Sequence, residues 1–259
     1  MILLDETNSK EDQYAMVLPH DLNERLYNAA CIFWNTRAMQ FNRQQGSTIH
    51  DQGNRSAVTG GKQLDGFVNL TYDILVYNGV PKDSIFIDSY LELPGYYRPS
   101  KKWDLLIVHR GILLAAIEFK SHVGPSFGNN FNNRTEEAMG SALDIWTAYR
   151  EGAFGNQEAP WLGYFMVLQD SDKSNTPVRI SSPHFAVFPE FEGSSYKDRY
   201  EIFCTKLVLE RQYNAACFIT TGLDIAHTPF LNCPAEHLSY YRFITSLLSN
   251  LIARINEIR

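Results

Sequence analysis

Three ionisable residues lie within two apolar segments near the middle of the chain. Residues 103–109 read WDLLIVH and residues 112–120 read ILLAAIEFK, and their strong charges are Asp104, Glu118 and Lys120. Glu118 and Lys120 are two positions apart, so a strand places both side chains on one face. Burying an ionised carboxylate is costly unless a cation compensates it. Two carboxylates and an ammonium group at one place therefore indicate a divalent cation held by oxygen ligands.

The turn between these segments decides whether Asp104 can join the other two charges. Two apolar runs separated by Arg-Gly at residues 110–111 are typical of a β-hairpin. A two-residue turn there would pair Asp104 with Ile117 and send its side chain to the opposite face. A turn longer by one residue would pair Asp104 with Glu118. A bulge near Trp103 would also re-aim the aspartate, so the chemistry requires either the longer turn or a bulge.

Magnesium chemistry gives each of the three residues a role. We expect Asp104 and Glu118 to hold Mg²⁺, with waters completing its coordination. The metal would neutralise charge that develops on a phosphodiester, while Lys120 would orient and polarise the attacking water. A simple salt bridge is the competing interpretation, because a Glu-x-Lys triplet occurs by chance about once in a chain of this size.

The composition is that of an ordinary globular chain of 259 residues, with 44% hydrophobic and 20% charged residues. We expect one domain over residues 1–259, with residues 1–18 as an N-terminal arm. The net charge of −6 argues against non-specific coating of nucleic acid, but it allows a cleft with concentrated Arg and Lys. No long apolar run or basic leader is present, so neither a membrane span nor a secretory signal is expected. Wide spacing predicts reduced thiols in a cytoplasmic protein for Cys31, Cys204, Cys217 and Cys233.

Helical and strand patterns alternate along the chain. Apolar spacing predicts helices over residues 21–40, 62–78, 134–150, 200–216 and 235–258. Strands are predicted at 84–89, in the two hairpin segments, at 161–169 and, as a short extended piece, at 185–188. Loops are predicted at 44–61, 121–133 and 170–182. This order predicts an α/β fold with a mixed central sheet flanked by helices, and the last helix packs in the core or at a dimer interface.

Several sequence blocks resemble a known enzyme family. The Asp104, Glu118 and Lys120 triplet resembles the PD-(D/E)xK nuclease motif, although Trp103 stands where that motif has its proline. Together with this triplet, four further blocks resemble the XhoI family of type II restriction endonucleases: 51–55 (DQGNR), 58–66 (VTGGKQLDG), 161–165 (WLGYF) and 195–216. The resemblance spans about residues 30 to 220.

The resemblance implies a function and partners. It implies the restriction-endonuclease-like core and Mg²⁺-dependent double-strand cleavage of DNA at a short palindrome by a homodimer. The enzyme that names the family cuts within CTCGAG. A restriction-modification system in a prokaryotic cytoplasm also implies a cognate DNA methyltransferase that protects host DNA without forming a stable complex. By this match Asp104 and Glu118 are the metal ligands and Lys120 activates water.

Polar residues around the predicted site are candidates for contacts with DNA. Side chains that pair with base edges or phosphates gather in the loop before the second helix and after the catalytic strand: Arg55, Lys62, Gln63, His122, Asn129, Asn130 and Arg134. A solvated loop without such a role is the competing interpretation. Asp65 is expected either in the second shell of the metal or as a favourable charge at a helix N-terminus.

Two other functions compete with sequence-specific cleavage. A repair or recombination nuclease on the same fold would cut branched or damaged DNA and ignore a plain palindrome. A catalytically inert DNA-binding protein would bind without Mg²⁺, and replacement of Asp104 by Asn would leave its behaviour unchanged.

Overall fold

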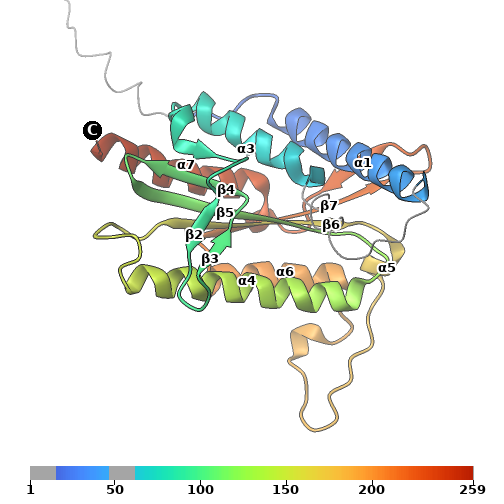
Figure 1. The fold of residues 1–259 in the computed structure, drawn as a ribbon. Helices are drawn as coiled ribbons and strands as arrows, with labels where there is room; N and C mark the ends of the chain where they lie inside the picture. Colours follow the sequence, from blue (N-terminus) through green and yellow to red (C-terminus); the bar gives the residue numbers. More distant parts are fainter. Residues whose placement is uncertain (1–15, 47–61, 259) are drawn as a thin grey trace, which may run out of the picture.

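A computed structural model describes residues 16–46 and 62–258 of the chain. Within them, a mixed six-stranded sheet forms the centre of the molecule (Figure 1). Its strands lie in the order β1 (Ile85–Phe86), β4 (Leu105–His109), β5 (Ile112–His122), β6 (Trp161–Gln169), β7 (Ala215–Leu223) and β8 (Pro229–Asn232). β5, β6 and β7 run parallel to one another, and the remaining neighbours pair antiparallel.

Helices cover both faces of this sheet (Figure 1). One face packs against α1 (Leu22–Gly46), α3 (Asp65–Tyr77) and α7 (Tyr240–Glu257), and the other packs against α4 (Phe127–Arg150) and α6 (Tyr196–Leu209). Two hydrophobic clusters separate the layers, and alternate residues of the strands point into each. The predicted α/β fold, with a mixed sheet flanked by helices, is confirmed.

The predicted strand at 161–169 is confirmed as β6, which is buried along nearly its whole length. It lies between two parallel partners and is covered by helices on both faces, which explains its unbroken apolar sequence. The predicted strand at 84–89 is reduced to β1, which has two residues. The helix predicted over 21–40 is longer, because α1 continues to Gly46, and the rest of the loop predicted at 44–61 lies outside the described residues.

The prediction of irregular structure over 121–133 was wrong. β5 continues to His122 and α4 already begins at Phe127. The Phe127 ring packs against the rings of His122 and Tyr196, with centroids 4.7 Å and 5.8 Å away. This packing outweighs the poor helix propensity of the Gly- and Asn-rich sequence that follows.

The helix predicted over 200–216 was also partly wrong. α6 ends at Leu209, and Arg211 takes a positive φ of 55° in the turn that follows. From Ala215 the chain becomes β7, which pairs with β6 along the parallel ladder. Residues 207–216 contain the end of a helix and the start of a buried strand. Apolar residues occur in both, so their spacing alone did not show where the helix ends.

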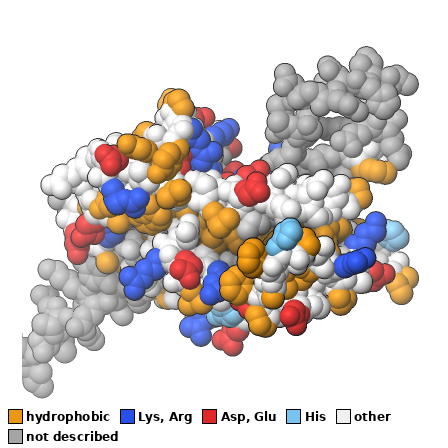
Figure 2. Space-filling view, turned by 90° about the horizontal axis from the view of Figure 1, so that it is seen from below, with side chains coloured by type: hydrophobic (Ala, Val, Ile, Leu, Met, Phe, Trp, Pro, Cys, Tyr) orange, Lys and Arg blue, Asp and Glu red, His pale blue; other side chains and the backbone are white. Residues whose placement is uncertain are grey.

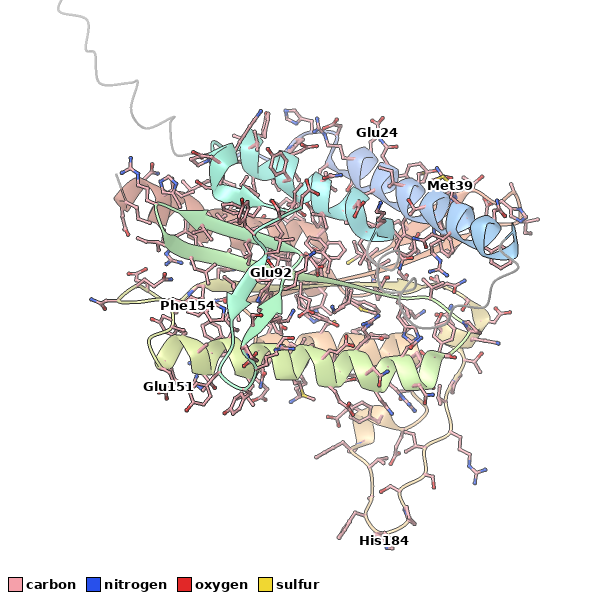
Figure 3. All side chains as sticks on the ribbon, in the orientation of Figure 1. Glu24, Met39, Glu92, Glu151, Phe154 and His184 are labelled. Carbon is pink, nitrogen blue, oxygen red and sulfur yellow. The ribbon has the colours of Figure 1, made fainter. Side chains whose placement is uncertain are left out.

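Two segments lie outside the main layers. A two-stranded hairpin of β2 (Glu92–Pro94) and β3 (Ser100–Lys102) crosses in front of the sheet, where Figure 3 labels Glu92. The loop after the short helix α5 (Asp172–Asn175) projects beyond α4 and α6 and includes the 3-10 helix η4 (Pro189–Phe191), with His184 near its tip in Figure 3. Seen from that side in Figure 2, acidic and basic side chains are interspersed among hydrophobic ones.

The predicted C-terminal helix is confirmed as α7, preceded by the 3-10 helix η5 (Glu236–Leu238). Its apolar face packs into the core of this chain, where Phe243 and Leu247 are fully buried, whereas Tyr241 is exposed. No helix in the described residues is both long and apolar enough to cross a membrane. The four cysteines form no disulfide.

Gly163 permits a tight contact in the centre of the sheet, so we predict that Gly163→Ala is destabilising. A Cβ at this position would lie 2.5 Å from Cζ3 of Trp161 and 2.8 Å from Cζ of Phe243. Overpacking of this kind lowers the free energy of unfolding by about 1–3 kcal/mol. Urea unfolding measures the change. Gly140→Ala on the exposed side of α4 is the control, because nothing lies within 4 Å of its Cβ, and it should be as stable as wild type or about 1 kcal/mol more stable, since Ala favours a helix. A Gly163→Ala variant as stable as the control would contradict the packing described here.

Candidate active site

The turn between β4 and β5 contains two residues. His109 pairs with Ile112, and the intervening Arg110 and Gly111 have φ angles of 49° and 81°. Positive φ at both positions is the conformation that two-residue hairpin turns favour. The longer turn considered from the sequence is therefore not formed.

A bulge in β5 changes the register beyond this turn. Val108 pairs with Leu113, but Ile107 pairs with Ala115, so Leu114 is an extra residue on β5. Leu114 and Ala115 consequently both point into the cluster beneath α1, α3 and α7. The bulge predicted as one alternative exists, but it lies between Ile107 and Val108 in the ladder and not near Trp103.

The bulge brings the two carboxylates into line. Leu105 pairs with Ile117, so Asp104 lies opposite Glu118 in the same register. The backbone confirms this placement, because the Asp104 N–H donates to the Ile117 carbonyl at 3.2 Å and Asp104 Oδ2 accepts from the Phe119 N–H at 2.8 Å. A bulge on β5 has thus compensated for a turn that alone would have separated the two side chains.

Glu118 is held through one of its two oxygens. Its side chain is 2% exposed, and Oε1 lies 2.6 Å from Lys120 Nζ and 3.1 Å from Lys101 Nζ. Oε2 is buried and has no hydrogen-bond partner among the described residues. A buried carboxylate oxygen without a donor is costly, so this atom is a position where a cation is expected.

Burial and neighbouring charges shift the pKa values of Asp104, Glu118 and Lys120 in opposite directions. Burial acts to raise the pKa of Glu118, but the ammonium groups of Lys120 and Lys101 outweigh it and hold that pKa below its usual value. Burial raises the pKa of Asp104, although Lys120 opposes the change. Burial also acts to lower the pKa of Lys120, yet Glu118 and Asp104 raise it overall, so Lys120 remains an ammonium ion.

These residues fit a divalent cation. Asp104 and Glu118 lie opposite each other, and Glu118 Oε2 is the unsatisfied oxygen that a hard cation would bind. No group of three or more His, Cys, Asp or Glu side chains suitable for a metal occurs in the part of the chain that the structure describes. Two carboxylates supplemented by water suit Mg²⁺, which keeps several of its waters in protein sites.

A pocket of about 390 Å³ opens beside Asp104, near the point where β4 begins. α3 borders it on one side, and α4 contributes Arg134. The charged residues of its lining are of both signs: Lys62, Lys102, Lys120 and Arg134, with Asp65, Asp88 and Asp104. Such a lining accommodates a metal ion and an anionic phosphate together.

Some of the predicted DNA contacts face this pocket. Lys62, in the 3-10 helix η2 (Lys62–Leu64), is exposed at its rim. Arg134 also lines it. Its Nη1 donates to Glu137 Oε2 at 2.6 Å, and its buried Nε has no hydrogen-bond partner within residues 16–46 and 62–258. Asn130 lies one turn before Arg134 on the same side of α4, whereas Asn129 is exposed elsewhere on the first turn. Arg55 lies outside the described residues.

Gln63, predicted to face DNA, is instead buried. Its amide oxygen accepts from Arg37 Nη1 at 3.0 Å and its amide nitrogen donates to Ser121 Oγ at 2.5 Å. Gln63 therefore connects α1 to the end of β5, and both ends of its amide are engaged. A direct base contact would require breaking these bonds.

His122, also predicted as a DNA contact, points into the protein. It is 1% exposed, its Nδ1 lies 2.8 Å from the Tyr200 hydroxyl, and its ring packs on Phe127. Burial lowers its pKa to about 4, so the ring is neutral near pH 7. Strand alternation continues to His122 and turns its side chain beneath α4 and α6, which the sequence prediction of a loop did not anticipate.

Asp65 lies at the first position of α3 and lines the pocket. Burial raises its pKa, Lys62 opposes that shift, and the negative charge of Asp88 adds to it. The sequence offered two roles for Asp65, a favourable charge at a helix N-terminus or a group near the metal. Both agree with this position, because Asp65 begins α3 and lines the same pocket as Asp104.

Lys101, which contacts Glu118, was not predicted from the sequence, and neither were Asp88 and Lys102 in the pocket lining. Lys101 comes from β3, outside the central sheet, and contacts the buried Glu118. The local signal was weak, because Lys101 and Lys102 read as ordinary surface charges before Trp103.

Known proteins resemble this chain over most of its length. The model of the restriction endonuclease XhoI family matches residues 43–229. The type II restriction enzyme BstVI of Geobacillus stearothermophilus is 51% identical over 206 residues, which cover 78% of this chain and 92% of that enzyme. The type II restriction enzyme XhoI of Xanthomonas vasicola is 48% identical over 180 residues, covering 69% and 72%.

A third relative, the type II restriction enzyme AbrI of Azospirillum brasilense, is 48% identical over 166 residues, covering 64% of this chain and 74% of that enzyme. No solved structure matches. The family match covers the β4–β5 hairpin, the pocket and most of the central sheet. This chain belongs to the XhoI family of restriction endonucleases, enzymes that cleave DNA site-specifically.

Proposed function

We propose that Asp104, Glu118 and Lys120 form the centre at which this restriction endonuclease hydrolyses a phosphodiester bond with the help of Mg²⁺. The observation that carries the proposal is the unpartnered Glu118 Oε2, buried opposite Asp104 while Oε1 is bound by lysine. Membership of the family supports it, because an enzyme that cleaves DNA needs a centre that hydrolyses a phosphodiester bond.

The chain's own residues have separate tasks in this proposal. Asp104 and Glu118 would hold the cation, and the Phe119 N–H fixes the orientation of the Asp104 carboxylate. When bound, Mg²⁺ neutralises charge on the scissile phosphate and acidifies a bound water. Lys120, kept protonated by its carboxylate neighbours, donates hydrogen bonds that orient the attacking water and offset the charge it brings.

The substrate of this proposal is double-stranded DNA with a short palindromic site. A homodimer with two-fold symmetry would place one centre on each strand, and CTCGAG is the site proposed by likeness to the XhoI enzyme. The enzyme would act in a prokaryotic cytoplasm beside a methyltransferase that protects host DNA. The proposed DNA contacts remain Lys62, Arg134, Asn129, Asn130 and Arg55. Asp65 is proposed to lie near the metal without binding it directly.

We predict that a digest of long, sequenced DNA yields discrete fragments when Mg²⁺ is present and none when it is chelated. The fragment ends should map to one short palindrome, because each half of the dimer reads the same half-site. Sequencing the ends measures this. A smear without common ends would favour cleavage by DNA structure, and intact DNA would favour an inert DNA binder.

We predict that Asp104→Asn, Glu118→Gln and Lys120→Ala each lower the cleavage rate by about a hundredfold or more. Each removes a metal ligand or the ammonium group while leaving the sheet in place. Single-turnover cleavage measures the rate, and urea unfolding with DNA binding in Ca²⁺ controls for folding. A variant that folds normally and cuts near the wild-type rate would remove that residue from the proposed centre.

We predict that Arg134→Ala weakens DNA binding and makes it less dependent on salt. The slope of the logarithm of the binding constant against the logarithm of salt concentration should become shallower by about one. Its guanidinium lines the pocket and has an unpartnered Nε. Binding is measured in Ca²⁺ over a series of salt concentrations. Arg150→Ala, at the opposite end of the same helix, is the matched control. Equal salt dependence in the two variants would show that Arg134 does not contact phosphate.

A further inference from the structure

Lys101 is a largely buried lysine outside the proposed catalytic triplet. Its side chain is 11% exposed, and its Nζ lies 3.1 Å from Glu118 Oε1 and 4.3 Å from the centre of the Trp103 ring. Lysines are seldom buried to this degree unless they are paired, and ordering such a long side chain is unfavourable in entropy. The β2–β3 hairpin therefore delivers a cation to Glu118 at a cost in stability.

Asp144 on α4 anchors the hairpin that carries Lys101. Its Oδ1 accepts the backbone N–H groups of Tyr96 and Tyr97 at 2.7 Å and 2.8 Å, and its Oδ2 accepts from Arg98 Nε at 2.7 Å. These bonds fix the tip of the hairpin. At its base, the Trp103 N–H donates to the Leu91 carbonyl at 2.9 Å. Because both ends of the hairpin are fixed, Lys101 is held in place.

The two lysines reach Glu118 Oε1 from different strands, Lys101 from β3 and Lys120 from β5. Lys120 lines the pocket beside Asp104, whereas Lys101 is not part of the pocket lining. The side chain of Lys120 is also the more exposed of the two, at 22% against 11% for Lys101, so Lys120 is the better placed to contact water and phosphate. If Lys120 were the sole partner of Oε1, any shift of its ammonium toward the attacking water would leave a buried carboxylate oxygen without compensation.

We propose that Lys101 is a positioning residue that keeps hold of Glu118 Oε1, so that Oε2 stays directed to the metal while Lys120 engages the attacking water. This inference rests on the proposed roles of Glu118 and Lys120. Asp104 and Glu118 together carry two negative charges, and Lys101 and Lys120 carry two positive ones. Lys101 therefore opposes metal binding through its charge, even though it supports the reaction through its geometry.

Because the charge of Lys101 weakens metal binding while its position supports cleavage, Lys101→Met should bind the metal more tightly and yet cleave DNA more slowly. Met keeps much of the length of Lys101 and its contact with Trp103, but it removes the charge. Mn²⁺ should bind the DNA-free protein more tightly, on the order of tenfold, because a nearby positive charge is lost. Single-turnover cleavage at saturating Mg²⁺ should fall by roughly ten- to a hundredfold, because Lys120 is retained by Glu118 and misplaced. DNA affinity in Ca²⁺ and its salt dependence should not change.

Electron paramagnetic resonance of Mn²⁺, single-turnover cleavage and salt-dependent DNA binding measure the three quantities. Weaker Mn²⁺ binding would overturn the proposal, because it would mean that Lys101 merely supports the fold around Glu118. Weaker DNA binding with a shallower salt dependence would make Lys101 a phosphate contact instead. An unchanged cleavage rate would show that Lys101 has no part in the reaction.

Two further variants keep the result interpretable. Lys206→Met, on the exposed last turn of α6, controls for loss of one positive charge and should behave as wild type. If Lys101→Met does not fold, Lys101→Gln keeps a hydrogen-bond donor without the charge and should still tighten Mn²⁺ binding. If Glu118→Gln itself cleaves normally, the proposed function fails. If Glu118→Gln is inactive while Lys101→Met is normal, the inference about Lys101 alone fails.

Discussion

Glu118 places an ionised carboxylate inside the central sheet, and several elements are arranged around that one charge. β5 is flanked by β4 and β6 and covered by helices on both faces, so Glu118 is buried in the interior of the protein. Lysines from two different strands compensate the charge on Oε1, and the bulge in β5 brings Asp104 of the neighbouring strand opposite Glu118. In a buried site these interactions are stronger than they would be in water, which is why their geometry matters for the proposed chemistry.

The parts of the site that could be predicted are those with a local signal. Asp104, Glu118 and Lys120 are charges in apolar runs, and the need for a longer turn or a bulge followed from strand alternation alone. Lys101 could not be found this way, because its position depends on a hairpin that folds back and is anchored to α4. Gln63 and His122 were chosen by residue type, and residue type does not reveal which way a side chain points.

The same distinction separates the predicted elements of the fold from the missed ones. β6 and α7 have long, uniform patterns; β6 was found with its observed bounds, and α7 with nearly its observed end, although it begins at Tyr240 and not at residue 235. The start of α4 and the strand β7 were missed, because they depend on distant partners: Phe127 packs on Tyr196, and β7 pairs with β6. Tertiary contacts decide such segments against their local propensity.

The central claim is that Asp104 and Glu118 Oε2 bind the catalytic cation, and the most direct test is crystallographic. Crystals of the protein grown with DNA and Mn²⁺ would be measured at a wavelength where manganese scatters anomalously. The account predicts an anomalous peak within coordination distance of both Asp104 and Glu118 Oε2, with Lys101 still on Oε1. A manganese ion bound elsewhere in the DNA complex, with Glu118 Oε2 contacting only protein, would contradict it.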